Sequence, residues 1–392
     1  MSTNTINRRS WFRQAGLVSA GLATAPALFG KATPEGQTWY EGVRSWEHLP
    51  TFKPAMAEMK ARLLANENAY GPSPMAKLAI MESVSKGNRY GHGEAQKLKA
   101  MLAEKEGVTP EHIILGPGST DILEKTAIAY FVNGGNIVAA DPAYMSIIKT
   151  AQSFGAKYKS VPLKDDWSHD LKGMAAAIDG DTKLIYVCNP NNPTGTLTDS
   201  KALYEFCKTA SKKAPVFVDE AYLEFMPEED QHSMVELIQE GENVIVARTF
   251  SKIHGMAGLR LGYGVAQPET LEKIRKMVRT TMGLNITSLI GGMASLRDED
   301  FIKNCRKWNK EAREYTFEQL KSMGYDPLTS HTSFILFPLA NATNGELFLE
   351  KMFGEGVGVR FFEVFDEPYC RVSMGTMDEM KLFVDAFQKV VG

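Results

Sequence analysis

The feature that most constrains this fold is the alternation of two patterns along residues 80–285. Short apolar runs rich in β-branched residues favour strands, and the amphipathic segments between them have helical periodicity. Strands are expected at His112–Leu115, Asn136–Ala140, Lys183–Cys188, Val216–Asp219, Val244–Arg248 and Gly262–Ala266, and helices at Thr120–Phe131, Ala143–Phe154 and Ser200–Ser211. This order implies βαβ units, so we predict an α/β fold with a mostly parallel, helix-covered sheet.

The C-terminal part, residues 286–392, has a different pattern. A long charged helical segment at Asp298–Met323 precedes three short strand-like runs and a final helix. The runs are Ser333–Phe337, Gly358–Phe361 and Cys370–Met374. We predict that residues 286–392 form a smaller α+β domain and residues 80–285 a large domain. The N-terminal segment, residues 33–79, is expected to be part of the smaller domain.

The first 32 residues differ from the rest of the chain. Arg8 and Arg9 lie in a basic segment that precedes a weakly apolar stretch, Ala15–Phe29, rich in Ala and Gly. A basic region before a short apolar region is typical of a secretory signal, and paired arginines resemble a twin-arginine signal. The stretch is too short and too poor in Leu and Ile for a stable membrane span. We therefore expect a leader at residues 1–32 and a periplasmic or secreted protein; the alternative is a disordered basic leader on a cytoplasmic protein.

The charge and cysteine content limit the kinds of partner and metal site that this chain is expected to have. A formal net charge of -3 and a pI near 6.2 give no global bias toward nucleic acid or anionic membranes. The four cysteines lie far apart, without a CxxC pair or companion histidines. They do not form the pattern of a disulfide framework or a zinc site, so we expect no metal.

Lys252 directly follows a predicted apolar strand and has apolar neighbours. Such surroundings would desolvate its ammonium and lower its pKa, and a neutral lysine can attack a carbonyl carbon. Taken alone, a lysine in a strand-to-helix loop is usually structural. Ser251 and Arg260 change this interpretation, because they supply a hydroxyl and a planar cation suited to a phosphate.

Asp219 ends a predicted buried strand, where open α/β sheets place ligand contacts. A buried carboxylate needs a positive partner, and a protonated pyridine nitrogen is one. Tyr222 follows closely, and Asn192 lies in a turn rich in Pro and Asn. Both can donate a hydrogen bond to a phenolate oxygen on the same ring. For Asn192, a plain Asn-Pro turn is the alternative.

The segment Leu115–Asp121 joins a strand to a helix. Gly118 permits close backbone approach, Ser119 can cap the helix, and the first helical N–H groups form an anion site. Glycine-rich turns of this kind are common, so this signal is weak by itself. Tyr144 follows the next strand and can stack on a flat ring; a lone tyrosine here would otherwise be core.

Together these segments resemble the fold-type I aminotransferases, most closely the histidinol-phosphate aminotransferase-like branch. The likeness spans nearly the whole chain after the leader and includes Asn66–Pro74 and Arg371–Thr376. It implies an aspartate aminotransferase-like fold with pyridoxal 5′-phosphate (PLP) as cofactor. It also implies amino-group transfer between an amino acid, or a related amine, and a 2-oxo acid by a ping-pong Schiff-base mechanism.

The resemblance implies a role for each cofactor residue. Lys252 would form the Schiff base and move the substrate proton, and Asp219 would pair with the pyridinium. Tyr222 would hold the phenolate oxygen together with Asn192, and Tyr144 would stack on the ring. The residues implied to hold the phosphate are Ser119, Thr120, Ser251 and Arg260.

The substrate and subunit residues are also implied by resemblance. Arg371 would bind the substrate carboxylate and Arg360 a second anion, while Tyr70 and Gly71 would lie beside the substrate. Tyr90 matches a tyrosine that reaches the cofactor phosphate of a partner subunit, which implies a homodimer with shared active sites.

Two departures bear on the substrate. The usual Tyr-Pro-Asp sequence is here Tyr90-Gly91-His92-Gly93, and we interpret His92 as a surface loop residue rather than a substrate contact. An exported location also fits poorly with histidine biosynthesis, so we do not expect histidinol phosphate to be the substrate. A PLP-dependent racemase, lyase or oxidase is the alternative on this scaffold, and a non-catalytic PLP-binding protein is a third.

Overall fold

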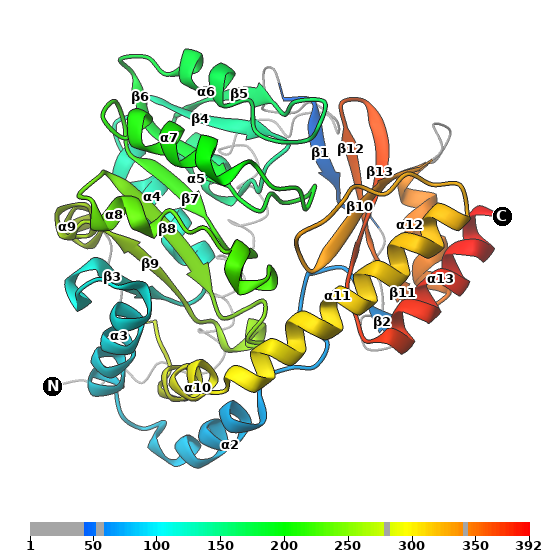
Figure 1. Ribbon diagram of the computed structural model, residues 1–392, viewed down its shortest axis with the longest axis horizontal. Coiled ribbons are helices and arrows are strands. Elements are labelled where there is room, and N and C mark those ends of the chain that lie inside the picture. Colours follow the sequence, from blue (N-terminus) through cyan, green and yellow to red (C-terminus); the bar gives the residue numbers. More distant parts are fainter. Residues whose placement is uncertain (1–42, 52–58, 278–282, 340–343) are drawn as a thin grey trace, which may run out of the picture. The chain divides into compact units, whose positions relative to one another are not determined.

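The computed structural model describes residues 43–51, 59–277, 283–339 and 344–392. Within these residues, seven strands form one sheet in the order β3-β9-β8-β7-β6-β4-β5 (Figure 1). Their bounds are β3 Ile113–Gly116, β4 Asn136–Asp141, β5 Lys157–Pro162, β6 Thr182–Cys188, β7 Val216–Asp219, β8 Val244–Thr249 and β9 Gly262–Ala266. Strands β4 to β8 pair in parallel, and β9 is antiparallel to both β3 and β8. The predicted mostly parallel sheet is confirmed.

Strand β5 is the one strand of this sheet that the sequence pattern does not predict. It lies at the sheet edge, and most of its residues are only half-buried or exposed. An edge strand needs no continuous apolar run. Because β5 contains Lys157 and Lys159, its sequence lacks the apolar pattern of a buried strand.

Helices cover both faces of this sheet. Side chains alternate along the strands, so Val216 and Val218 point into one apolar core while Phe217 points into the other. The first core receives α3 His92–Glu106, α6 Leu171–Ala177, α7 Ser200–Ala210, α8 Val235–Gln239 and α10 Ile286–Arg297. The second receives α4 Ser119–Phe131, α5 Ser146–Ser153 and α9 Pro268–Met277. Figure 1 shows α7 in front of the strands and α4 behind them.

Shorter elements complete this part of the chain. Helix α2 Pro74–Ser83 packs against α10 and continues into the 3-10 turn η3 Val84–Lys86. The other 3-10 turns are η4 Pro110–His112, η5 Leu223–Phe225, η6 Glu228–Asp230 and η7 Ala257–Leu259.

A second, antiparallel sheet has the order β1-β12-β13-β10. Its strands are β1 Ser45–His48, β10 Phe334–Pro338, β12 Arg360–Val364 and β13 Glu367–Ser373. A separate parallel pair joins β2 Ala61–Arg62 to β11 Val357–Gly358. The run expected at Gly358–Phe361 is therefore divided between two strands. Both β1 and β2 come from the N-terminal segment, whereas the limits predicted for the two domains remain a proposal.

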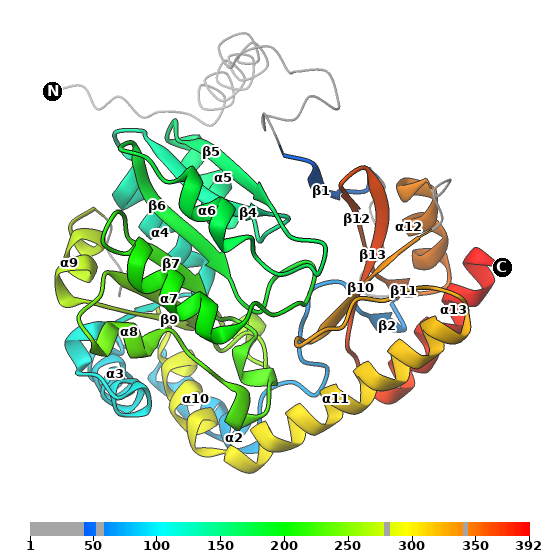
Figure 2. The same cartoon turned by 45° about the horizontal axis from the view of Figure 1, so that its top comes forward.

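Helices α11 Glu299–Ser322, α12 Gly345–Gly354 and α13 Met377–Val391 accompany the second sheet. Its core is built on Phe337, Phe383 and Phe387, whose rings contact one another. Figures 1 and 2 both show α11 extending from beside α10 to this sheet.

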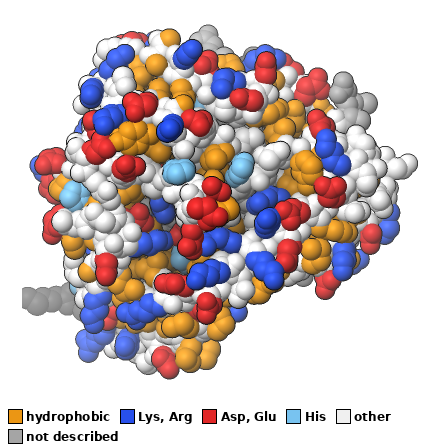
Figure 3. Space-filling view, in the orientation of Figure 1, with side chains coloured by type: hydrophobic (Ala, Val, Ile, Leu, Met, Phe, Trp, Pro, Cys, Tyr) orange, Lys and Arg blue, Asp and Glu red, His pale blue; other side chains and the backbone are white. Residues whose placement is uncertain are grey.

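The surface shown in Figure 3 carries Lys and Arg side chains interspersed with Asp and Glu, without a large patch of one sign. Among the described helices, none is long and apolar enough to cross a membrane. The predicted leader, residues 1–32, lies outside the described residues.

Candidate active site

Lys252 lies in the loop that follows the buried strand β8. Its Nζ donates a hydrogen bond to the carbonyl oxygen of Ala65 over 3.2 Å and lies 5.5 Å from the centre of the Tyr222 ring. Burial, together with the positive charge of Arg371, lowers the pKa of Lys252 to about 8. This amine is therefore neutral at a lower pH than an ordinary lysine, as its apolar sequence neighbours predict.

A close approach of two backbone segments shapes the Lys252 loop. A β-carbon at Gly255 would collide with the backbone of Gly71, so the contact requires glycine at position 255. Asn68 strengthens the same junction by donating from Nδ2 to the carbonyl oxygen of Ile253 over 2.8 Å. The segment around Gly71 is thereby held against the lysine loop.

Asp219 ends β7 and is only 3% exposed. The hydroxyl of Tyr186 donates to its Oδ2 over 3.4 Å, and the backbone N–H of Ala221 donates to its Oδ1 over 3.2 Å. Burial nevertheless raises the pKa of Asp219 to about 6, because two hydrogen bonds do not replace the water lost. A cation at this carboxylate would offset the cost of burying it.

Tyr222, whose ring centre lies 5.5 Å from Nζ of Lys252, has a specific hydrogen-bond partner. Asn66 donates from Nδ2 to the Tyr222 hydroxyl oxygen over 3.0 Å, which leaves the phenol proton available for another acceptor. Ser373 fixes Asn66 through two hydrogen bonds of 2.8 Å. Asn66 has a φ of 53°, a left-handed conformation that asparagine tolerates better than most residues.

The sequence pattern predicts no separate role for Asn66. The available signal is its position at the start of the segment that carries the family resemblance. Tyr186, whose hydroxyl reaches Asp219, is a second residue of this kind, and it lies at the start of the segment that contains Asn192.

Arg371 extends from β13 and is 7% exposed. Its guanidinium donates to Asn192 Oδ1 over 2.6 Å and to the carbonyl oxygen of Leu64 over 3.3 Å. The rings of Phe334 and Phe362 lie 5.3 and 5.1 Å from its charged carbon. Within the described residues its buried Nε has no hydrogen-bond partner. A buried guanidinium with an unused donor is suited to a carboxylate ligand.

Arg360 lies directly opposite Arg371 in the pairing of β12 with β13. Its Nε donates to the same carbonyl oxygen, that of Leu64, over 3.1 Å. Its Nη1 lies 2.9 Å from Oε1 of Glu47 on β1. The predicted second anion contact therefore lies beside Arg371 and already has a carboxylate partner, which the sequence pattern does not predict.

The predicted anion site lies where β3 meets α4. Ser119 is the first residue of α4, and Gly118 before it has a φ of 93°, which favours glycine. A β-carbon at Gly262 would collide with the backbone at Ser119, so the turn packs directly on β9. Arg260 donates from Nη2 to the carbonyl oxygen of Pro117 over 3.2 Å. The N–H groups at the start of a helix, beside a guanidinium, are suited to a phosphate.

Three more predicted residues lie at this end of the sheet. Thr120 and Tyr144 bring their hydroxyl oxygens within 3.4 Å of each other. Tyr144 is half-buried, and burial raises its pKa. Ser251 is buried beside Lys252, and its backbone N–H donates to Thr249 Oγ1 over 3.1 Å.

Two predicted tyrosines have surroundings of their own. Tyr70 packs its ring on Trp308, with 4.3 Å between the ring centres. Tyr90 is 75% exposed and lies beside His92 in a surface hollow lined also by Leu284 and Leu289. His92 is exposed, as expected, but it is the first residue of α3 rather than a loop residue. The contacts of the described chain thus do not bring Tyr90 to the Lys252 cluster.

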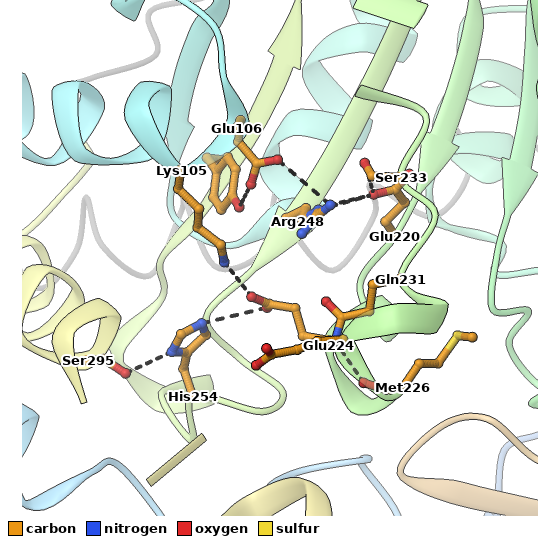
Figure 4. Close-up of polar contacts among 12 residues, drawn as sticks. Lys105, Glu106, Glu220, Glu224, Met226, Gln231, Ser233, Arg248, His254 and Ser295 are labelled. Atoms are coloured by element: carbon orange, nitrogen blue, oxygen red, sulfur yellow. Dashed lines mark hydrogen bonds and ion pairs between the residues drawn. The ribbon is translucent and has the colours of Figure 1, made fainter. Parts of the chain in front are cut away.

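A buried charge network supports β7, which ends at Asp219, and β8, which precedes the Lys252 loop (Figure 4). Arg248 on β8 lies 3.0 Å from Glu220 and 3.7 Å from Glu106. Glu220 also accepts from the backbone of Met234 over 2.7 Å. Since Glu220 directly follows Asp219, this network fixes the end of β7 in place.

A family model described as aminotransferase class I and II matches residues 58–387. The chain belongs to the class I and II aminotransferases. A histidinol-phosphate aminotransferase of Moorella thermoacetica is 36% identical over 332 residues, covering 84% of this chain and 85% of that protein. Its counterpart in Caldicellulosiruptor saccharolyticus is 33% identical over 335 residues, covering 85% and 92%. The crystal structure of histidinol-phosphate aminotransferase from Sinorhizobium meliloti in complex with pyridoxal-5′-phosphate is 28% identical, with a TM-score of 0.78 and coverage of 85% and 91%.

This aminotransferase is a PLP-dependent transaminase with the aspartate aminotransferase-like fold, as the family resemblance implies. Its residues fit the cofactor: Asp219 is a buried carboxylate suited to a cationic ring nitrogen, and the start of α4 with Arg260 is suited to a phosphate. All four cysteines are free and buried. Among the described residues, no cluster of His, Cys, Asp or Glu is suited to a metal ion.

Proposed function

We propose that this transaminase acts on amino acids whose α-carboxylate binds Arg371 and whose amino group would react with the PLP carbonyl carbon held by Lys252. The observation that carries this proposal is the buried guanidinium of Arg371, with its unpartnered Nε. Asn192, in the turn after β6, accepts a hydrogen bond from this guanidinium, and Asp219 ends the neighbouring strand β7. A carboxylate there would supply both the missing acceptor and the missing negative charge.

The cofactor residues divide into four groups. Asp219 keeps the ring nitrogen protonated, and Asn192 and Tyr222 donate to the phenolate oxygen. Ser119, Thr120, Ser251 and Arg260 hold the phosphate, while Tyr144 packs on the ring. Bound in this way, PLP supplies an electron sink for the charge that develops at the substrate α-carbon.

Lys252 then acts as the acid and base that moves the substrate proton. Its pKa of about 8 is close to neutral pH, so the amine can both accept and return a proton. The Ala65 carbonyl oxygen positions Nζ, and Tyr70 and Gly71 lie on the neighbouring segment, where we place the substrate side chain.

Borohydride reduction tests the central assignment. The purified protein should be yellow, and reduction should attach the cofactor irreversibly to Lys252. The Lys252→Ala variant should lose this linkage. A reduced adduct on another residue of that variant would refute the assignment of Lys252.

Half-transamination with a panel of amino acids tests the reaction. Conversion of bound cofactor to its pyridoxamine form supports the proposal. Release of ammonia or pyruvate, uptake of oxygen, or inversion of the α-carbon without conversion would instead indicate the lyase, oxidase or racemase alternative. Histidinol phosphate belongs in the panel because of the relatives' names, and a strong preference for it would overturn our choice of amino acids as donors.

We also propose that two chains form a homodimer in which Tyr90 reaches the partner's cofactor phosphate. The high exposure of Tyr90 supports this, as does an apolar stripe on α2 and η3 formed by Met75, Leu78, Met81 and Val84. Sedimentation should give a dimer, and Tyr90→Ala should weaken cofactor binding without dissociating the chains. A stable monomer with full cofactor affinity would refute this proposal.

For residues 1–32 we propose export by the twin-arginine route, since Arg8 and Arg9 precede a short apolar stretch. Fused to a reporter, residues 1–40 should direct it out of the cytoplasm, and replacing both arginines by lysine should retain it inside. Retention of both fusions would favour the disordered leader of a cytoplasmic enzyme.

A further inference from the structure

One face of the four-stranded sheet brings together two arginines and one carboxylate. Arg360 on β12 is directly opposite Arg371 on β13, and Glu47 on β1 is directly opposite Phe362. Glu47 is thus a diagonal neighbour of Arg360 on the same face, a distance that long side chains bridge. The 2.9 Å ion pair between them follows from this register.

The two guanidiniums share one backbone acceptor. Arg360 and Arg371 both donate to the carbonyl oxygen of Leu64, over 3.1 and 3.3 Å. Two like charges held at one oxygen repel each other, so the pair favours anions nearby. Glu47 supplies the first of these anions, and its charge influences Arg371 as well as Arg360.

The charge of the bound substrate determines whether positive and negative charges on this face are equal in number. If Arg371 binds the α-carboxylate, as in the proposed function, two positive charges meet two negative charges, those of Glu47 and the substrate. A donor with a second acidic group near Arg360 would bring a third negative charge. To bind Arg360, that group would have to break the ion pair between Glu47 and Arg360. The Glu47 carboxylate, whose side chain is only 35% exposed, would then lack a cationic partner.

We propose that Glu47 is a specificity-determining residue of this aminotransferase. By pairing with Arg360, it makes the site favour amino donors with a single carboxylate over donors that carry a second carboxylate or a phosphate. This inference rests on the proposed function, which assigns the α-carboxylate to Arg371. The selection arises from a competing internal anion rather than from the shape of the pocket.

The test compares donors in the wild-type holoenzyme and in Glu47→Gln, which keeps the side-chain size and removes the charge. The ratio of kcat/KM for aspartate, glutamate and O-phosphoserine to that for alanine should rise about fivefold or more, while the value for alanine changes by less than about twofold. An unchanged or lower ratio overturns the proposal.

Two further variants identify the cause. In an Arg360→Gln background, Glu47→Gln should change the donor ratio by less than about twofold, because Glu47 acts mainly through its ion pair with Arg360. Glu363→Gln is the matched control, since Glu363 is on β12 but belongs to the opposite face of the strand. A rise of about fivefold in Glu363→Gln, or in the Arg360→Gln background, would also contradict the proposal.

A binding measurement separates failure of this inference from failure of the proposed function. The affinity of the holoenzyme for succinate and for butyrate, followed by the change in cofactor absorption, requires no turnover. Glu47→Gln should tighten succinate about fivefold and leave butyrate unchanged. If wild type converts no amino acid, the proposed function fails, and the succinate-to-butyrate ratio still decides the role of Glu47.

Discussion

Arg371 donates to the side-chain oxygen of Asn192 over 2.6 Å and so joins the four-stranded sheet to the turn that follows β6. Because the amide oxygen of Asn192 is used in this bond, its NH₂ group is left to donate elsewhere. One hydrogen bond thus orients two groups at once. In the proposed function, this bond orients Arg371 toward the substrate carboxylate and Asn192 toward the phenolate oxygen of the cofactor.

The first prediction concerns the carboxylate site. Replacing Arg371 by glutamine should lower kcat/KM for amino acids about 100-fold or more, because a buried charged hydrogen bond to the substrate is lost. Arg371→Lys should recover little of this, since an ammonium lacks the two-pronged donor geometry. Steady-state kinetics provides the check, with an amine that lacks a carboxylate as control. An equal loss for that amine would mean that Arg371 acts elsewhere.

The second prediction concerns the pH at which apoprotein captures its cofactor. The neutral amine of Lys252 is the reactive form, and its pKa is about 8 rather than 10.5. The capture rate, measured by the appearance of cofactor absorption, should rise with pH and level off above pH 8. Since Arg371 contributes to the lowered pKa, Arg371→Gln should move this plateau to higher pH. A wild-type rate that still rises at pH 10.5 would contradict the burial of this amine.

The third prediction follows from the raised pKa of Asp219, about 6 in the fold against 3.8 normally. Between these values folded apoprotein binds more protons than the unfolded chain, so the free energy of unfolding falls as pH rises. At neutral pH, Asp219→Asn should therefore make apoprotein more stable, by up to about 3 kcal/mol, with the gain vanishing near pH 4. Urea unfolding of both apoproteins measures this. The variant should also bind PLP more weakly, because it lacks the carboxylate.

The fourth prediction concerns the buried network behind the site. Arg248→Met should destabilise the protein by about 3–5 kcal/mol, because Glu106 and Glu220 are left buried without their cation. Thermal and denaturant unfolding test this. Lys389→Met, which removes an exposed ion pair with Glu355, is the control and should cost less than about 1 kcal/mol. Similar losses for the two variants would show that burial of the network matters little.

Much of the large sheet was predictable from the sequence, because its strands are buried on both faces. The run Val216–Val218 before Asp219 and the run Gly262–Ala266 contain no charged residue and are buried throughout, and the strands have the predicted bounds. Strand β5 was not predictable in this way, since an exposed edge tolerates the lysines of its sequence. The short strands β1 and β2 were also not predicted, because they form by pairing with β12 and β11, which are distant in the sequence.

The local sequence by itself determined the chemistry of single residues: a lysine after an apolar strand, a carboxylate at a strand end, glycines before a helix. These features depend on residues adjacent in the sequence, so a single segment is enough to predict them. Only the tertiary structure decided which distant groups meet, such as Asn66 with Tyr222 and Glu47 with Arg360. These contacts depend on strand register and on the packing of segments far apart in the chain, and no local pattern contains that information.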